Sequence, residues 1–310
     1  MVIAHRGASG YLPEHTMEAK ALAFGLGADY LEQDVVASRD GQLLVFHDLY
    51  LDALTDVAAR FPSRARPDGH FYVIDFDLDE IQTLRVGARR DNTGNPIFPE
   101  RYVQGRQYCR IHTLDAELQM VRELNRQMGR NVGVYPEIKA PSWHRQHGCD
   151  LAKLLLGCLA EFGYGQRGDA VFVQCFDPAE LSRLRTELRT DLKLIQLIGS
   201  GTEDGVDYEQ LASPVGLREV GGVVDGVGPA WQRLVDAQGG PLAFTGQAHG
   251  LGLVVHPYTF RAEQLPAFSD SLESMLHHFM ATVAVDGVFC DFPDEAVRVR
   301  DALWRGEDVG

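Results

Sequence analysis

The sequence has few cysteines, and their spacing gives them no shared role. The five cysteines, at positions 109, 149, 158, 175 and 290, lie far apart and form no Cys-x-x-Cys pair. A zinc finger, a thioredoxin-type redox motif and a disulfide framework are therefore not indicated. We expect these residues to be small buried side chains or free thiols.

Long apolar runs and positive charge are also scarce. No stretch approaches the ~20 apolar residues that a membrane-spanning helix needs, and no signal-type segment precedes the first apolar run. Against 44 Asp and Glu there are only 29 Lys and Arg, a formal net charge of -15 at pH 7. Because such a surface repels polyanions, we expect no nucleic-acid partner, and an anionic substrate would need a local positive site. The lack of a long apolar run predicts no integral membrane segment.

Motifs of several large enzyme classes are missing as well. No GxGxxG or Walker loop follows the first apolar run, which argues against a nucleotide-binding fold. There is no GxSxG elbow of a serine hydrolase and no HExxH zinc motif. The chemistry must therefore come from residues that the fold brings together.

What the sequence has is a rhythm of short apolar runs and longer amphipathic stretches. The runs are "MVIAH", "ADYLEQDV", "QLLVFH", "NVGVYPEI", "DAVFVQCF", "LKLIQLI", "VVDGVG", "LGLVVHPY" and "VDGVFCDF", and helical patterns fall at 16–27, 115–129, 149–163 and 177–188. Such alternation predicts an α/β protein with parallel strands. Eight or nine strand candidates in one chain favour a (β/α)8 barrel over a doubly wound sheet, with the excess candidate a loop or an irregular strand.

One segment interrupts this rhythm. Residues 49–110, after the third strand candidate, are rich in Asp, Arg, Gly and Pro and carry little sustained periodicity. Long insertions in compact domains commonly form lids or binding loops. We therefore predict a single catalytic barrel domain over 1–310 with an insertion or lid region at 49–110.

Ionisable residues concentrate at four predicted strand ends. These residues are His5 and Arg6, Glu32 and Asp34, His47 and Asp48, and Glu137 and Lys139. In a βα barrel, catalytic groups collect at the carboxyl ends of the strands. Singly, each residue could be a surface or turn residue, but their occurrence at successive strand ends favours an active site.

The spacing of the acids suggests a cation. Glu32 and Asp34 are two residues apart, so on a strand both carboxylates face the same way and repel each other unless a cation lies between them. Glu137 would complete an oxygen-rich site for Ca²⁺ or Mg²⁺. If a hairpin turns on Asp40-Gly41, position 47 falls opposite position 34, which brings His47 towards these acids.

This set of residues suits phosphodiester cleavage. Arg6, Lys139 and a cation would neutralise the phosphoryl oxygens, and His5 and His47 would move protons near neutral pH.

The motifs also resemble a known family. The blocks "HRGASGYLPEHT", "YLEQDVVASRDGQLLVFHD", "YPEIKAP", "VFVQCFDP", "VVHPYTFR" and "DGVFCDFPD" are similar to those of the glycerophosphodiester phosphodiesterases, most closely the bacterial periplasmic type. The similarity runs from residue 2 to about residue 300 and includes the insertion. Many relatives have Asn where this chain has His15, and the periplasmic type tolerates His there.

The resemblance implies a (β/α)8 barrel that hydrolyses glycerophosphodiesters, such as glycerophosphocholine or glycerophosphoethanolamine, to sn-glycerol 3-phosphate and an alcohol. It implies Glu32, Asp34 and Glu137 as ligands of Ca²⁺, with Mg²⁺ as the second choice. His5 and His47 match the acid/base pair, which we assign as base and acid respectively. Relatives proceed either by direct water attack or through a cyclic phosphate, and both routes stay open here.

The resemblance also implies substrate contacts. Arg6 and Lys139 match phosphate contacts, Gln174, Phe176 and His256 match positions on the glycerol side, and Asp291 is expected to stabilise the last loop. We expect a periplasmic location, since the chain opens directly on its first strand as a protein without its leader would, with the cytoplasm as the second choice. A homodimer is possible, and the sequence does not indicate the oligomeric state.

Two other functions remain open. A related barrel phospholipase acting on membrane lipids would be expected to have apolar or aromatic docking loops, whereas the insertion is charged and rich in Gly and Pro. A binding protein that keeps the fold without catalysis would be expected to lack a histidine or an acid of the site, and this chain has them all.

Overall fold

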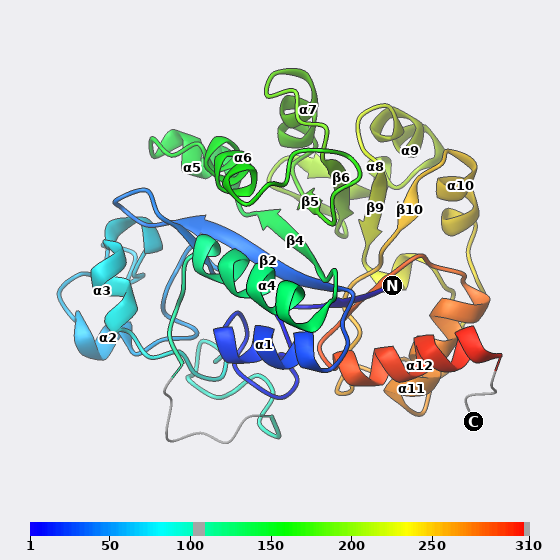
Figure 1. The fold of residues 1–310 in the computed structure, drawn as a ribbon, viewed down its shortest axis with the longest axis horizontal. Coiled ribbons are helices and arrows are strands. Elements are labelled where there is room, and N and C mark those ends of the chain that lie inside the picture. Colours follow the sequence, from blue (N-terminus) through cyan, green and yellow to red (C-terminus); the bar gives the residue numbers. More distant parts are fainter. Residues whose placement is uncertain (102–108, 307–310) are drawn as a thin grey trace.

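The computed structural model describes residues 1–101 and 109–306. Eight parallel strands curl into one sheet in the order β10-β9-β6-β5-β4-β2-β1-β11 (Figure 1). They are β1 (Val2–Ala4), β2 (Tyr30–Ala37), β4 (Gly133–Ile138), β5 (Phe172–Cys175), β6 (Lys193–Ile198), β9 (Gly226–Pro229), β10 (Val254–Val255) and β11 (Val288–Cys290). A parallel bridge between Phe260 and Cys290 joins the segment that follows β10 to β11, so the sheet closes as the predicted (β/α)8 barrel.

Helices cover the outside of this sheet. They are α1 (Met17–Gly25), α4 (Leu114–Met128), α5 (Pro141–Gln146), α6 (Leu151–Glu161), α7 (Pro178–Thr186), α8 (Tyr208–Leu211), α9 (Pro214–Gly221), α10 (Phe244–Gly250), α11 (Leu272–His277) and α12 (Pro293–Arg305). Outside the insertion, the described residues form two further helical turns, η2 (Trp231–Arg233) and η3 (His278–Thr282), and a small hairpin pairs β7 (Thr202–Glu203) with β8 (Val206–Asp207). No helix among the described residues is both long and apolar enough to cross a bilayer.

The four predicted helices are confirmed as α1, α4, α6 and α7. At the start of α7, the Asp177 side chain accepts from the backbone N–H of Ala179 at 2.9 Å, and Pro178 occupies the first turn. This is the cap that the sequence predicts, since an aspartate satisfies a free N–H and proline needs none. The cysteines are also as expected, because all five are free and three of them are buried.

The excess strand candidate is β3 (Leu43–Val45), which pairs antiparallel with β2. The predicted register of this hairpin is wrong by one residue. Val35 lies opposite Val45, so Asp34 faces Phe46, whose backbone N–H donates to the Asp34 carbonyl at 2.8 Å. The backbone N–H of Ser38 donates to the carbonyl of Gln42 at 3.0 Å, so the turn between them has three residues rather than two, and Gly41 takes the left-handed φ of 76° that such a loop needs.

The insertion, as far as it is described, forms no further βα unit. It contains α2 (Val57–Arg60), η1 (Val73–Asp75) and α3 (Leu78–Thr83), which lie together beyond the carboxyl end of β2 (Figure 1). Its apolar residues form a hydrophobic cluster that includes Phe71, Phe76 and Ile81 and also takes in Val36 and Leu44 from β2 and β3. Residues 102–108 of the predicted insertion lie outside the described part of the chain.

Side-chain alternation along the strands places the site above an apolar layer. Inside the barrel, a buried cluster contains Ile3, Tyr135, Phe172, Ile195 and Phe289. The residue two positions further along each strand faces the same way and lies one layer closer to the carboxyl end. Those next residues are His5, Glu137, Gln174, Leu197 and Asp291.

A buried polar cluster supports β2 from the helix side. Lys20 of α1 and Glu117 of α4 are fully buried and form an ion pair of 3.0 Å. Lys20 Nζ also donates to the backbone carbonyl of Glu32, while Gln33 and His112 bind the Glu117 carboxylate at 2.7 Å each. Burial raises the pKa of Glu117, but the charge of Lys20 and these hydrogen bonds outweigh it and lower the pKa to about 2.

We therefore expect Glu117→Gln to lower the free energy of unfolding by about 3–5 kcal/mol at pH 7, because it leaves the Lys20 charge buried without its partner. Glu117 has its pKa lowered from 4.5 by folding, so it contributes its stability above about pH 4.5 and loses it as the pH falls towards 2. Urea unfolding followed by circular dichroism at several pH values measures both effects.

The matched control is Glu123→Gln on the same helix, where Glu123 pairs with Arg126 at the surface. That change should cost about 0.5 kcal/mol or less. Equal losses in the two variants would contradict the proposed importance of the buried pair.

Candidate active site

A cavity of about 740 Å³ opens at the carboxyl ends of the barrel strands. Nine of the ten residues that the sequence analysis proposed for the site line it. They are His5, Arg6, Glu32, Asp34, His47, Glu137, Lys139, Gln174 and Phe176. The structure thus brings together residues from five strand ends, as the barrel interpretation requires.

His256 is the predicted residue that does not line this cavity. It is fully buried, and its Nδ1 pairs with the hydroxyl of Tyr135 at 2.8 Å inside the barrel. The cavity wall is instead reached by Tyr258, two residues further along the same segment. The predicted substrate contact of His256 is wrong, because its side chain lies one layer deeper in the barrel than the residues that line the cavity.

The turn after β1 explains the order of residues in the opening tripeptide His5-Arg6-Gly7. His5 continues the strand into the cavity, and Arg6 then adopts a left-handed φ of 57°. Gly7 follows with a φ of 87°, and a Cβ there would lie 2.8 Å from the backbone of Ala19 in α1. Only glycine fits this turn, which directs His5 and Arg6 into the same cavity.

Each of the two histidines is held by an aspartate. His5 Nδ1 lies 2.6 Å from Asp291 Oδ1, and His47 Nδ1 forms a short hydrogen bond with Asp48 Oδ1. An ionised carboxylate can only accept, so Nδ1 carries the proton in both rings and Nε2 is left with its lone pair. This tautomer is the one required of a proton acceptor in the cavity.

Burial sets the charge state of both rings. It lowers the pKa of His5 to about 4, although the neighbouring Asp291 raises it. Burial, together with the charges of Arg6 and Lys139, also lowers the pKa of His47 to about 4. Both imidazoles are therefore neutral at pH 7 while the cavity holds no anion.

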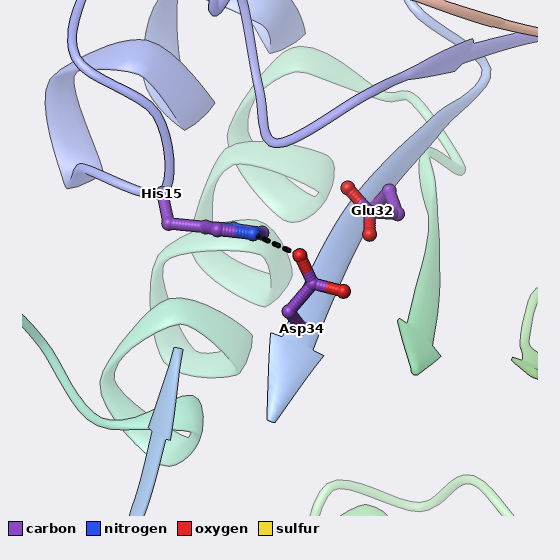
Figure 2. A group of neighbouring side chains, drawn as sticks. All are labelled: His15, Glu32 and Asp34. Carbon is purple, nitrogen blue, oxygen red and sulfur yellow. Dashed lines mark hydrogen bonds and ion pairs between the residues drawn. The ribbon is translucent and has the colours of Figure 1, made fainter. Parts of the chain in front are cut away.

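Glu32 and Asp34 lie side by side on β2 with their carboxylates close together, and His15 points at Asp34 from the loop before α1 (Figure 2). His15 Nε2 lies 2.6 Å from Asp34 Oδ2. Asp34 Oδ1 is buried and accepts no hydrogen bond from the described residues, and Lys139 Nζ lies 3.7 Å from it. One ligand atom from each of these three residues lies within 4.8 Å of the others, close enough to share a metal ion.

Glu137, the third acid of the predicted metal set, is placed somewhat differently. It lies opposite Asp34 in the β2–β4 register, and its Oε1 accepts from Lys139 Nζ at 2.6 Å. Burial, together with the Asp34 charge, raises the pKa of Glu137 to about 7 despite Lys139. Burial and the same neighbour raise the pKa of Glu32 as well.

The pKa of Asp34 moves the other way. Burial raises it, but the charge of Lys139 and the hydrogen bond from His15 outweigh that effect and hold it well below the usual range. The site therefore holds one ionised carboxylate and two that favour protonation. A cation between them would replace those protons, so the donor set fits a divalent metal ion.

Four contributors were missed or undervalued by sequence reasoning. Asp291 and Asp48 were expected to stabilise loops or turns, Tyr258 was not singled out, and His15 was treated only as a family variation. Tyr258 could have been found from the two-residue alternation Val254, His256, Tyr258. The aspartates had no such signal, because a carboxylate that binds Nδ1 is recognised only once the rings are placed.

Comparison with known proteins gives the same family along nearly the whole chain. The model of the glycerophosphoryl diester phosphodiesterase family matches residues 5–295. A glycerophosphodiester phosphodiesterase of Haemophilus influenzae is 42% identical, with 96% of this chain and 88% of that protein covered. One from Treponema pallidum is 37% identical over 96% of this chain and 91% of its own length.

The fold agrees with these sequence relationships. A phosphodiesterase of Oleispira antarctica, solved in complex with the product sn-glycerol-3-phosphate, superposes with a TM-score of 0.64. The two chains are 20% identical, and the match covers 97% of this chain and 96% of the other. With its barrel, its clustered site and these relatives, the chain belongs to the glycerophosphodiester phosphodiesterase family and is a phosphodiester hydrolase.

Proposed function

We propose that the protein hydrolyses water-soluble glycerophosphodiesters, such as glycerophosphocholine and glycerophosphoethanolamine, to sn-glycerol 3-phosphate and an alcohol. The observation that carries this proposal is the pair of neutral histidines, each fixed by an aspartate, on a cavity that also contains Arg6 and Lys139. Two oriented imidazoles beside two cations suit a reaction in which an anionic phosphodiester gains and loses protons.

In this proposal His5 is the base and His47 the acid. His5 Nε2 takes a proton from water as the water oxygen bonds to phosphorus, and His47 gives a proton to the alcohol oxygen as its P–O bond breaks. The phosphate charge offsets the Arg6 and Lys139 charges that lower the pKa of His47, so substrate binding favours the protonated form that an acid needs.

The proposed cation site consists of Glu32, Asp34 and Glu137. His15 donates to Oδ2 of Asp34, and Oδ1 accepts no hydrogen bond from the described residues and is available to a cation. Ca²⁺ is the first choice because it prefers several carboxylate oxygens, and Mg²⁺ is the second. When bound, such an ion would neutralise charge on the phosphoryl oxygens.

The surface supports small soluble substrates over membrane lipids. Among the described residues, the exposed large apolar side chains are distributed over separate elements, and the insertion contributes only Ile97. An enzyme that docks on lipid needs a contiguous apolar face. The full set of acids and histidines also argues against a binding protein without catalysis.

The metal prediction has two readouts. Treatment with EDTA should abolish release of sn-glycerol 3-phosphate from glycerophosphocholine, and Ca²⁺ should restore it. Ca²⁺ should also raise the melting temperature of the EDTA-treated protein, because it binds only the folded site. The same rise should be nearly absent in Glu137→Gln and smaller but present in His15→Gln. Unchanged turnover after exhaustive chelation would rule out the metal site.

The histidine prediction concerns kcat. His5→Ala and His47→Ala should each lower kcat by roughly 10² to 10⁴, the usual contribution of a general acid or base. His249→Ala is the matched control, since its ring pairs with Asp286 near the surface. Near-normal kcat in either cavity variant would remove that histidine from the mechanism.

A further inference from the structure

The insertion contacts both aspartate–histidine pairs through arginines. Arg89 and Arg101 lie 12 positions apart near the end of the described part of the insertion. Both line a small second cavity of about 80 Å³ that adjoins His5 and Arg6. Nothing in the reaction proposed above uses either arginine directly.

Arg89 donates three hydrogen bonds, two to Glu14 and one to Asp48. Its Nε and one terminal nitrogen grip the two oxygens of Glu14 at 3.0 and 2.8 Å. Its other terminal nitrogen donates to Asp48 Oδ2 at 2.7 Å. Since Asp48 Oδ1 binds His47 Nδ1, Arg89 occupies the one remaining carboxylate oxygen of that pair.

Arg101 repeats this arrangement on the other pair. Its Nε and one terminal nitrogen grip the two oxygens of Glu263 at 2.6 Å each. Its other terminal nitrogen lies 2.9 Å from Asp291 Oδ2, and Arg261 donates to the same oxygen at 2.9 Å. Asp291 Oδ1 binds His5 Nδ1.

Glu14 and Glu263 lie in loops of the barrel. Each arginine therefore links a glutamate of a barrel loop to the aspartate that holds a histidine. The contacts are shielded from water, because the side chains of Arg89 and Arg101 are only 20% and 11% exposed. A guanidinium group suits this geometry, since its fork binds one carboxylate and its third nitrogen remains for another.

We propose that Arg89 and Arg101 are positioning residues, through which the insertion fixes the ring orientation of His47 and His5 respectively. Each arginine locks the second oxygen of an aspartate and thereby restricts rotation of the carboxylate that holds Nδ1. Small misplacement of a catalytic ring is costly, and partners of this kind commonly affect activity 10- to 100-fold. The inference rests on the proposed function, because the two histidines must act on the substrate.

The experiment measures kcat and KM for glycerophosphocholine with Ca²⁺ in the full chain. Arg101→Ala should lower kcat by about 10- to 100-fold and leave KM within about threefold. Arg89→Ala should lower kcat similarly and also raise KM, because Glu14 holds Arg6 at 2.6 Å as well as Arg89. About 10 mM guanidinium should restore part of kcat in both variants, since it can refill the vacated site.

The control is Arg66→Ala. Arg66 is an arginine of the insertion that does not line the cavity, and it donates two hydrogen bonds to the Asp75 carboxylate, at 2.7 and 2.8 Å. This variant should keep the wild-type kcat and show no response to guanidinium. A purely structural role would lower the melting temperature of all three variants and give no guanidinium rescue.

If an alanine variant does not fold, the corresponding lysine variant takes its place. A single ammonium cannot reproduce the three-point contact, so kcat should still fall clearly. If the wild type is active and the arginine variants keep a kcat within about twofold of it, this inference is overturned while the proposed function stands. A wild type that releases no sn-glycerol 3-phosphate would overturn the proposed function and this inference together.

Discussion

The alternation of side chains along parallel strands is the constraint on which the rest of this structure depends. In a closed barrel, every second residue of each strand faces the interior, and successive inward residues form layers. One layer holds Tyr135, Phe172 and Phe289, and the next holds the ionisable groups of the cavity. The apolar layer excludes water from one side of the site, and burial accordingly lowers the pKa of His5 and raises that of Glu137.

Charge balance within that layer follows from the same burial. The chain as a whole carries a formal charge of -15, yet Arg6 and Lys139 place positive charge beside the acids of the proposed cation site. Each of these cations is itself held by an acid, Arg6 by Glu14 at 2.6 Å and Lys139 by Glu137 at 2.6 Å. An anionic substrate and a divalent cation would therefore enter together most favourably, because each compensates charges that the other exposes.

Much of this could be predicted from the sequence, because strand ends and residue spacing are local properties. The barrel, four helices, the cap at Asp177 and nine cavity residues were within reach of pattern and resemblance. The depth of a side chain in the barrel and the register of the β2–β3 hairpin could not be predicted. The hairpin register depended on whether the turn has two or three residues, and His256 was misplaced because a strand pattern tells which face a residue lies on, not in which layer. The role of Asp291 as the partner of His5 Nδ1 could not be predicted either, since the two residues are far apart in sequence and meet only when the barrel closes.

Closure also explains why an insertion can act on both sides of the site. β1 and β11 are neighbours in the barrel, so the two ends of the chain place His5 beside Asp291. His47 reaches the same cavity from the hairpin that leads into the insertion. The insertion therefore starts beside one aspartate–histidine pair and passes the other before it returns to α4, so its arginines meet both. The barrel supplies the positions of the rings, while their orientation depends on carboxylates that the insertion helps to hold.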